Sequence, residues 1–211
     1  MGARVKSYRS PLREQQAQET RERILRAARG TLRDQGYGAT TLADIARSAG
    51  VAEQTVRASF KTKANVVEHL LRLAIRGTDG ELELQQRDAF RHMLASNDAT
   101  TLLSRLTELA EEVHRRSWDV MEIVRGASAS DPAISELHEQ RRRARHTNQR
   151  TVANRLRELG ALPAHTSPET AADLLWLYTS PDIYRMLVIE QRWSATRYRA
   201  WFRAAVASIL T

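Results

Sequence analysis

Apolar side chains recur every three or four positions along most of this 211-residue chain, and only 9 Gly and 5 Pro interrupt them. This spacing is typical of amphipathic helices. Ala, Leu, Arg and Glu, which dominate the composition, also favour helix. No segment alternates between apolar and polar residues for long, as a strand would. We therefore predict an all-α protein.

The composition excludes several classes of protein. Hydrophobic residues make up 42% of the chain, enough to form a core. Cysteine is absent, which excludes disulfide scaffolds, thiolate zinc sites and cysteine nucleophiles. No apolar run reaches the roughly 18 residues that a membrane helix needs, and the N-terminus lacks the apolar stretch of a signal peptide. We expect a cytoplasmic protein that does not bind membranes.

Positive charge is concentrated near the N-terminus. The first 66 residues contain 13 Lys and Arg against 6 Asp and Glu, whereas the other 145 residues contain 20 against 19. A basic segment on an otherwise balanced protein is typical of nucleic-acid binding. A solvated basic tail is the alternative that charge alone leaves open.

The basic segment contains the pattern of a helix-turn-helix. A first helix is expected over 20–35. Thr41 is a good N-cap for a short second helix, with Asp44 completing a capping box and Gly50 closing the helix. A third helix is expected over 52–60. Two short helices joined by a turn that contains glycine form a helix-turn-helix.

The last of these helices has a polar face suited to a DNA groove. Val56 and Phe60 should face the core, which places Gln54, Arg57 and Lys61 on the opposite side. Gln can pair bidentately with adenine and Arg with guanine. Glu53 lies a turn before Arg57, and we expect no pairing between them.

Further contacts are expected around this face. Thr55 can donate to a phosphate or touch a thymine methyl group. Thr41 and Lys63 stand at helix starts, where free backbone N–H groups also meet phosphate. Arg47 is a further candidate for a phosphate contact.

The same segment resembles the DNA-binding domain of TetR-family transcriptional regulators. The matching residues are spread over about 45 positions in the right order: Ile24, Ala27, Ala28, Gly36, Tyr37, Thr40, Thr41, Ile45, Ala46, Ala49, Gly50, Val51, Thr55, Phe60 and Lys63. The resemblance implies DNA contacts at Thr41, Gln54, Thr55 and Lys63. Two positions depart from the family pattern, because Leu32 stands where the family usually has Phe and Arg57 where it usually has Tyr.

The rest of the chain is expected to form a separate helical domain. Four capping residues mark helix starts, three of them followed by proline: Asp131, Ser167, Ser180 and Ser194. After a helix over 63–76, helices are expected near 81–95, 100–115, 117–128, 132–159, 168–179, 181–191 and 195–210. The chain thus divides into a flexible basic arm (1–17), a helix-turn-helix DNA-binding domain (18–66) and a helical regulatory and dimerisation domain (67–211).

The last helices carry a wide apolar stripe that could hold two copies together. A dimer is needed because one helix-turn-helix offers few base contacts. In the family that the chain resembles, two C-terminal helices from each subunit form a four-helix bundle. The expected interface residues are Leu174, Tyr198, Trp201, Phe202, Val206 and Ile209.

The resemblance also implies a ligand pocket within the C-terminal bundle. The candidate lining residues are Trp118, Met121, Leu137, Trp176 and Tyr178. His114, His138 and His146 lack the spacing of metal ligands, so no metal site or cofactor is expected.

These observations predict a ligand-responsive, homodimeric repressor that binds a palindromic operator in double-stranded DNA and is released by a small-molecule effector. No nucleophile–base spacing or phosphate-binding glycine loop suggests an enzyme. Two alternatives remain open: an all-α enzyme with a basic surface, and a ligand-independent architectural DNA-binding protein.

Overall fold

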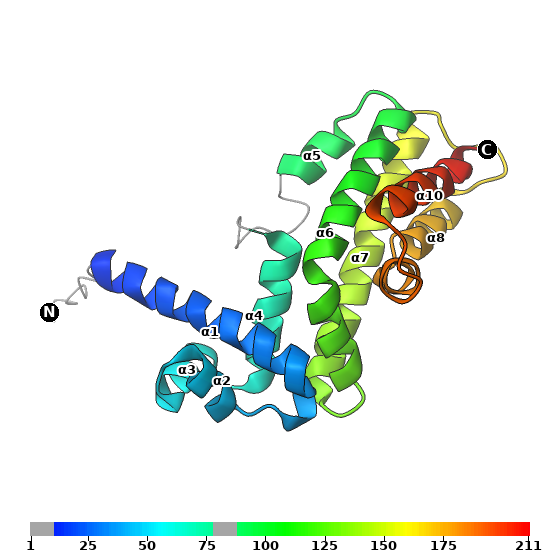
Figure 1. Cartoon of the computed structure of the whole chain (residues 1–211). Coiled ribbons are helices and arrows are strands. Elements are labelled where there is room, and N and C mark those ends of the chain that lie inside the picture. The colour runs from blue at the N-terminus through cyan, green and yellow to red at the C-terminus, as the bar shows by residue number, and fades with distance from the viewer. Residues whose placement is uncertain (1–10, 78–87) are drawn as a thin grey trace, which may run out of the picture. The chain divides into compact units, whose positions relative to one another are not determined.

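A computed structural model of the chain describes residues 11–77 and 88–211 (Figure 1). All regular elements in these two ranges are helices, which confirms the all-α prediction. The backbone divides into two compact units, with the boundary between Leu70 and Leu71.

The first unit contains three complete helices and the start of a fourth. They are α1 (Pro11–Ala39), α2 (Leu42–Ala49), α3 (Glu53–Phe60) and α4 (Lys63–Arg76). Figure 1 shows α2 and α3 as two short helices that meet at an angle. Their shared core consists of apolar residues at the spacings that the sequence predicts: Ile24, Ala28, Leu32, Ile45, Val56, Phe60, Val66 and Val67, all fully or almost fully buried.

Helix α1 begins earlier than the sequence analysis predicts. The arm expected over 1–17 is helical from Pro11 onward, and its first ten residues lie outside the described residues. Proline suits the first helical position, where its missing N–H is not needed. Side-chain hydrogen bonds between residues four apart, such as Gln15 to Glu19 at 3.0 Å, support the added turns.

Local capping sets the ends of the helices in the helix-turn-helix. Regular α1 geometry ends at Gly36, whose φ is 79° and ψ 162°. The Thr41 hydroxyl accepts a hydrogen bond from the Asp44 N–H, and the Asp44 carboxylate accepts one from the Thr41 N–H, which confirms the capping box. Gly50 ends α2 in the left-handed conformation, with φ 63°.

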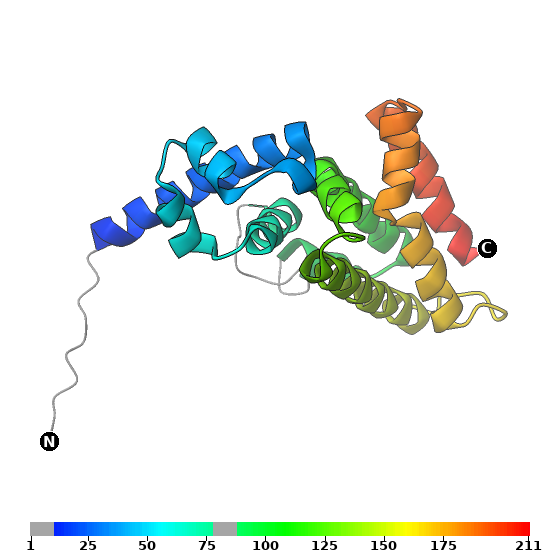
Figure 2. The ribbon, with the colours of Figure 1, turned by 90° about the horizontal axis from the view of Figure 1, so that it is seen from below.

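The second unit is a bundle of helices. They are α5 (Asp88–Leu94), α6 (Ala99–Ala127), α7 (Pro132–Glu158), α8 (Pro168–Tyr178), α9 (Pro181–Tyr184) and α10 (Ala195–Ala207). A π-helical segment, Arg185–Glu190, continues α9, and a 3₁₀ turn, Ser208–Leu210, follows α10. Helix α7 packs against α8, and α10 packs against both α6 and α8 (Figure 2).

Four of these helices start where the capping residues predict. The side chains of Asp131, Ser167, Ser180 and Ser194 each accept a hydrogen bond from a backbone N–H in the first turn of α7, α8, α9 or α10. These contacts satisfy donors that have no partner within the helix.

The prediction of two helices over 100–115 and 117–128 is wrong, because α6 runs through both without a break. The Ser117 hydroxyl, next to the expected break, donates to the Val113 carbonyl at 2.8 Å within the helix. Within the described residues, the helix expected over 81–95 corresponds to α5, Asp88–Leu94, and residues 81–87 of the expected helix lie outside the described residues.

Candidate nucleic-acid interface

Helix α3 presents a polar face to solvent, as its sequence predicts. Val56 and Phe60 are buried, whereas Gln54, Arg57 and Lys61 are exposed. Thr55, half-buried, flanks this face. Four of the predicted DNA-contact residues therefore lie together on and around one short helix.

The expectation that Arg57 has no acidic partner is wrong. Its Nε donates to Glu53 Oε1 at 2.7 Å, and the Arg57 side chain is exposed, whereas Glu53 is partly buried. The two residues are four apart, so they occupy the same side of the helix one turn from each other.

A contact that the sequence analysis does not predict fixes the end of α3. Arg21 of α1 donates from Nη1 to the Ser59 carbonyl at 3.0 Å, and its guanidinium lies 4.5 Å from the centre of the Phe60 ring. A cation at a helix C-terminus also interacts favourably with the helix dipole. Arg21 and Ser59 are 38 residues apart, so no local sequence pattern predicts this contact.

Lys63 faces inward, where the sequence analysis predicts a phosphate contact. Its Nζ donates to the carbonyls of Tyr37 and Thr40, at 2.5 and 2.7 Å, and lies 4.1 Å from the centre of the Tyr37 ring. The Lys63 ammonium therefore holds the loop between α1 and α2. A phosphate contact at this position would fall to the backbone N–H groups at the start of α4.

The cap of α2 ties up the Thr41 side chain in a similar way. Its hydroxyl is hydrogen bonded to Asp44, and these bonds hold the pKa of the Asp44 carboxyl below its usual value. Arg47 also donates to Asp44, at 2.9 Å, yet its side chain is 77% exposed and reaches into solvent. Of these three residues, only Arg47 presents an extended charged side chain.

Lys61 ends α3 in a strained conformation. Its φ is 63° and its ψ −56°, and the Thr62 N–H donates to the Phe60 carbonyl at 2.7 Å. These are the features of a γ-turn with positive φ, which is rare for residues other than glycine. The turn carries an exposed lysine at the end of the polar face.

In the second unit, by contrast with the exposed polar face of α3, polar side chains form a buried cluster. His114 of α6 lies with Nε2 3.1 Å from the Thr179 carbonyl, and its Nδ1 is 3.4 Å from the hydroxyl of Tyr198. A neutral imidazole satisfies both contacts by donating from Nε2 and accepting at Nδ1. Burial lowers the pKa of His114 to about 4, and nearby Arg145 adds to this effect.

Arg145, on the neighbouring helix α7, binds the C-terminal end of α8. It donates to the Trp176 carbonyl and, at 3.4 Å, to the Thr179 hydroxyl. The guanidinium also lies 4.4 Å from the centre of the Trp176 ring. Burial lowers the pKa of Arg145 to about 10. The sequence offers no pattern that would assign this role to Arg145.

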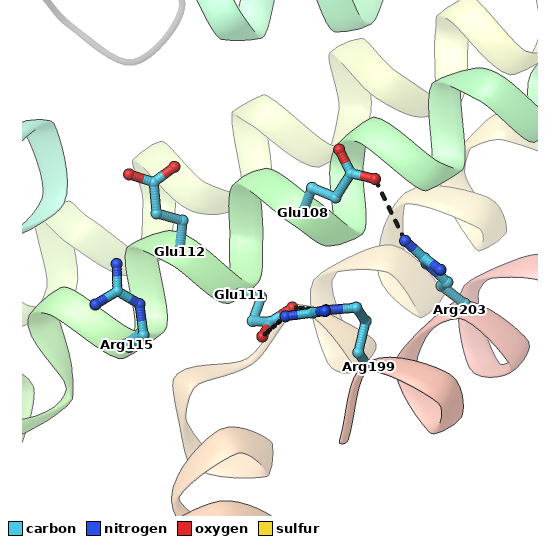
Figure 3. Close-up of a pocket in the computed structure, with 6 residues that line it drawn as sticks. All are labelled: Glu108, Glu111, Glu112, Arg115, Arg199 and Arg203. Atoms are coloured by element: carbon cyan, nitrogen blue, oxygen red, sulfur yellow. Dashed lines mark hydrogen bonds and ion pairs between the residues drawn. The ribbon is translucent and has the colours of Figure 1, made fainter. Parts of the chain in front are cut away.

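An open hollow of about 280 Å³ lies between α6 and α10 in the second unit, and its walls are charged (Figure 3). None of the residues predicted to line a ligand pocket lines this hollow. Arg199 donates to both Glu111 oxygens at 2.7 and 2.8 Å, and Arg203 to Glu108 at 3.3 Å. Leu137 is buried, Trp118 is exposed, and three further predicted residues are half-buried: Met121, Trp176 and Tyr178.

The structure corrects most of the predicted dimer interface. Tyr198, Phe202, Val206 and Ile209 are at most 2% exposed, because α10 turns this stripe onto the core of its own unit. A buried stripe of this kind cannot face a second copy. Leu174 and Trp201 are half-buried and remain accessible at the edge of the core.

Metal sites and membrane spans are both absent from residues 11–77 and 88–211. No three His, Asp or Glu side chains there are grouped as metal ligands would be. No helix in these ranges combines the length and apolar character that crossing a bilayer requires.

Comparisons with known proteins decide the family. Residues 24–70, within the first unit, match the sequence profile described as bacterial regulatory proteins, tetR family. Over 184 residues, which are 83% of each chain, the protein is 30% identical to the "Probable HTH-type transcriptional regulator ArpR" of Pseudomonas putida. The chain belongs to the TetR family. It is accordingly a DNA-binding transcriptional regulator and not an enzyme.

Another curated relative and two solved structures are similar to this protein over most of the chain. TtgR, another HTH-type transcriptional regulator of Pseudomonas putida, is 29% identical over 83% of both chains. The structure of a SmeT–triclosan complex aligns with a TM-score of 0.69, 21% identity and 90% coverage of each chain. Salmonella enterica GusR aligns with a TM-score of 0.66 and 21% identity, over 97% of this chain and 99% of its own.

Proposed function

We propose that the protein is a dimeric repressor that reads a palindromic operator with α3 and leaves it when a small molecule binds the second unit. The first unit would be the DNA-binding domain, and the second the regulatory and dimerisation domain. The observation that carries the proposal is the polar face of α3, where Gln54, Arg57 and Lys61 are exposed above the buried Val56 and Phe60.

The side chains on this face suit a major groove. Gln54 can pair with adenine, and Arg57 with guanine, through two hydrogen bonds each. Ala58 is small and lets the helix approach the bases closely. We expect Arg47, Lys61 and the backbone N–H groups at the starts of α2 and α4 to meet phosphates.

Replacing Arg57 measures how much this face contributes. We expect Arg57→Ala to weaken operator binding by about 1–3 kcal/mol. A loss confined to one base position in each half-site would identify a base contact. A uniform loss with a salt slope flatter by about one unit would identify a phosphate contact. Unchanged affinity would contradict the proposed face.

A palindromic operator requires two readers, and the exposed apolar side of α8 offers a surface for pairing. Leu174 and Leu177 lie three residues apart on α8, opposite the buried Leu175. Leu177 is 47% exposed, and with the half-buried Leu174 beside it forms an apolar patch that a partner would cover. Trp201 of the adjacent α10 would extend this surface.

Leu177→Glu tests the dimer without disturbing the core. We expect the variant to sediment as a monomer at micromolar concentration and to bind the operator at least about tenfold more weakly. Leu73→Glu is the matched control, because Leu73 is 43% exposed on α4 and lies outside the proposed interface. A monomeric wild type would refute the dimer.

The effector is proposed to be small and largely apolar or aromatic. Trp118, Met121, Leu137, Trp176 and Tyr178 remain the candidate contacts, and SmeT, a relative by fold, has been solved with triclosan bound. Binding must favour the state that cannot hold DNA, since otherwise no shift results. A compound that lowers operator affinity and quenches tryptophan fluorescence would support this part of the proposal. Quenching with unchanged operator affinity would contradict it.

Selection of bound DNA from a random library is the decisive experiment. A palindrome with half-sites about one helical turn apart would establish sequence-specific binding by a dimer. A single half-site would contradict dimeric reading, and no enrichment would contradict the proposed operator.

A further inference from the structure

The ion pair on α3 uses only one edge of the Arg57 guanidinium. Nε donates to Glu53 Oε1 at 2.7 Å, and Nη2 lies 2.5 Å from the same oxygen. A single carboxylate oxygen therefore holds the edge formed by Nε and Nη2. This side-on contact orients the plane of the guanidinium on the surface of the helix.

The other edge keeps its donors. Arginine has five N–H groups, and the pair Nη1 and Nη2 still presents two outward N–H groups after the contact with Glu53. Within the described parts of the chain, Glu53 is the one residue that bonds the Arg57 side chain. Two parallel N–H groups match the O6 and N7 acceptors that guanine presents in the major groove.

The carboxylate also changes what Arg57 can bind. An exposed ion pair contributes little to folding, so stability does not explain it. On a face that approaches DNA, a negative charge repels phosphates. A phosphate that takes the Nε and Nη2 edge must displace Glu53, whereas a guanine on the opposite edge leaves the ion pair intact.

We propose that Glu53 is a positioning residue that makes Arg57 selective for guanine over phosphate. The proposal rests on the DNA-reading face of α3 proposed above. It adds that specificity at one base pair of each half-site depends on a residue that touches no base itself.

Glu53→Gln in the full-length protein tests this role, because it keeps the side-chain size and removes the charge. Glu22→Gln is the matched control. Glu22 and Arg26 form an exposed ion pair with the same four-residue spacing, on α1 of the same unit. Each variant is titrated with the selected operator, with operators altered at single base pairs, and with a scrambled duplex, at two salt concentrations.

For Glu53→Gln we expect discrimination at one guanine position to fall about fivefold, and affinity for the scrambled duplex to rise about two- to fivefold. Glu22→Gln should leave base discrimination unchanged. An equal change in affinity for all duplexes in both variants would overturn the proposal, because Glu53 would then act only through net charge.

The double variant Glu53→Gln/Arg57→Ala tests whether Glu53 acts through Arg57. Its base preferences should equal those of Arg57→Ala alone. A further change at any base position would show that Glu53 reads a base itself, which overturns the proposal. Wild-type preference for the operator over the scrambled duplex is measured first. If the wild type shows no such preference, the proposed function is refuted together with the role of Glu53. If the preference is present, a negative result for the variants refutes only the role of Glu53.

Discussion

The two units place their polar side chains differently. In the first, the residues proposed to meet DNA, such as Gln54 and Arg57, stay in solvent above a small apolar core. In the second, His114 and Gln149 are buried within the bundle. A surface that binds a polyanion needs cations within reach of it. In the second unit the end of α8 is buried, and the Thr179 carbonyl there needs a polar partner, which His114 supplies.

Three inward-facing cations make the same pair of contacts, two of them in the first unit and one in the second. Arg21 and Lys63 bind backbone carbonyls in the first unit, and Arg145 binds one in the second. All three also lie over an aromatic ring. Cations that face inward thus fix the ends of helices and loops. A positive charge on a side chain is therefore not enough to identify a DNA contact.

The largest expected effect tests whether the units unfold separately. Phe60 and Phe202 are both almost completely buried, one in each unit. Replacing either with Ala should cost about 3–5 kcal/mol. Hydrogen exchange should show Phe60→Ala opening the first unit and Phe202→Ala the second. Loss of protection across both units in either variant would contradict independent unfolding.

A change of pH should affect the second unit through His114. Its folded pKa of about 4 lies below the 6.5 of the unfolded chain, so the unfolded state takes up the proton first. The stability contributed by the neutral ring is complete above pH 6.5 and is lost as the pH falls toward 4, by about 3 kcal/mol. Denaturant titrations at several pH values measure this loss. His114→Gln should reduce the slope in this range, and an unchanged slope would assign it to other groups.

The smallest effect concerns two glycines within helices. Gly30 lies inside α1, and a methyl group there would meet no atom within 4 Å. Gly30→Ala should therefore raise the free energy of unfolding of the first unit by about 0.5–1 kcal/mol. Gly126, equally open in the last turn of α6, should gain less when replaced by Ala. Thermal melting of the two variants compares these gains. A lower melting temperature for Gly30→Ala would contradict the prediction.

Much of the fold follows from short-range chemistry. Thr41, Asp131, Ser167, Ser180 and Ser194 cap helices because their side chains reach an N–H two or three residues away, a distance that the sequence states directly. The polar face of α3 follows from helical periodicity in the same way.

Long-range packing decides what the sequence alone cannot. The apolar stripe of α10 is equally suited to a partner chain and to its own core, and only the position of α6 and α8 shows that it is core. Lysine is usually exposed, yet two carbonyls 26 and 23 residues earlier in the chain bind Lys63. The ion pair of Glu53 and Arg57 is different, because its four-residue spacing is visible in the sequence and could have predicted it.

The π-helical segment Arg185–Glu190 gives the chain a point of adjustable register. The Gln191 N–H donates to the Met186 carbonyl, five residues back, at 3.1 Å, where an α-helix would reach four back. Deleting one residue within the segment would restore ordinary α-helical spacing and rotate the residues between the deletion and Glu190 by about 100°. Sequences that differ by one residue in this segment would therefore turn different side chains toward the same neighbour. A change of one residue in length at this point would therefore alter the packing surface of the segment while the helices around it stay the same.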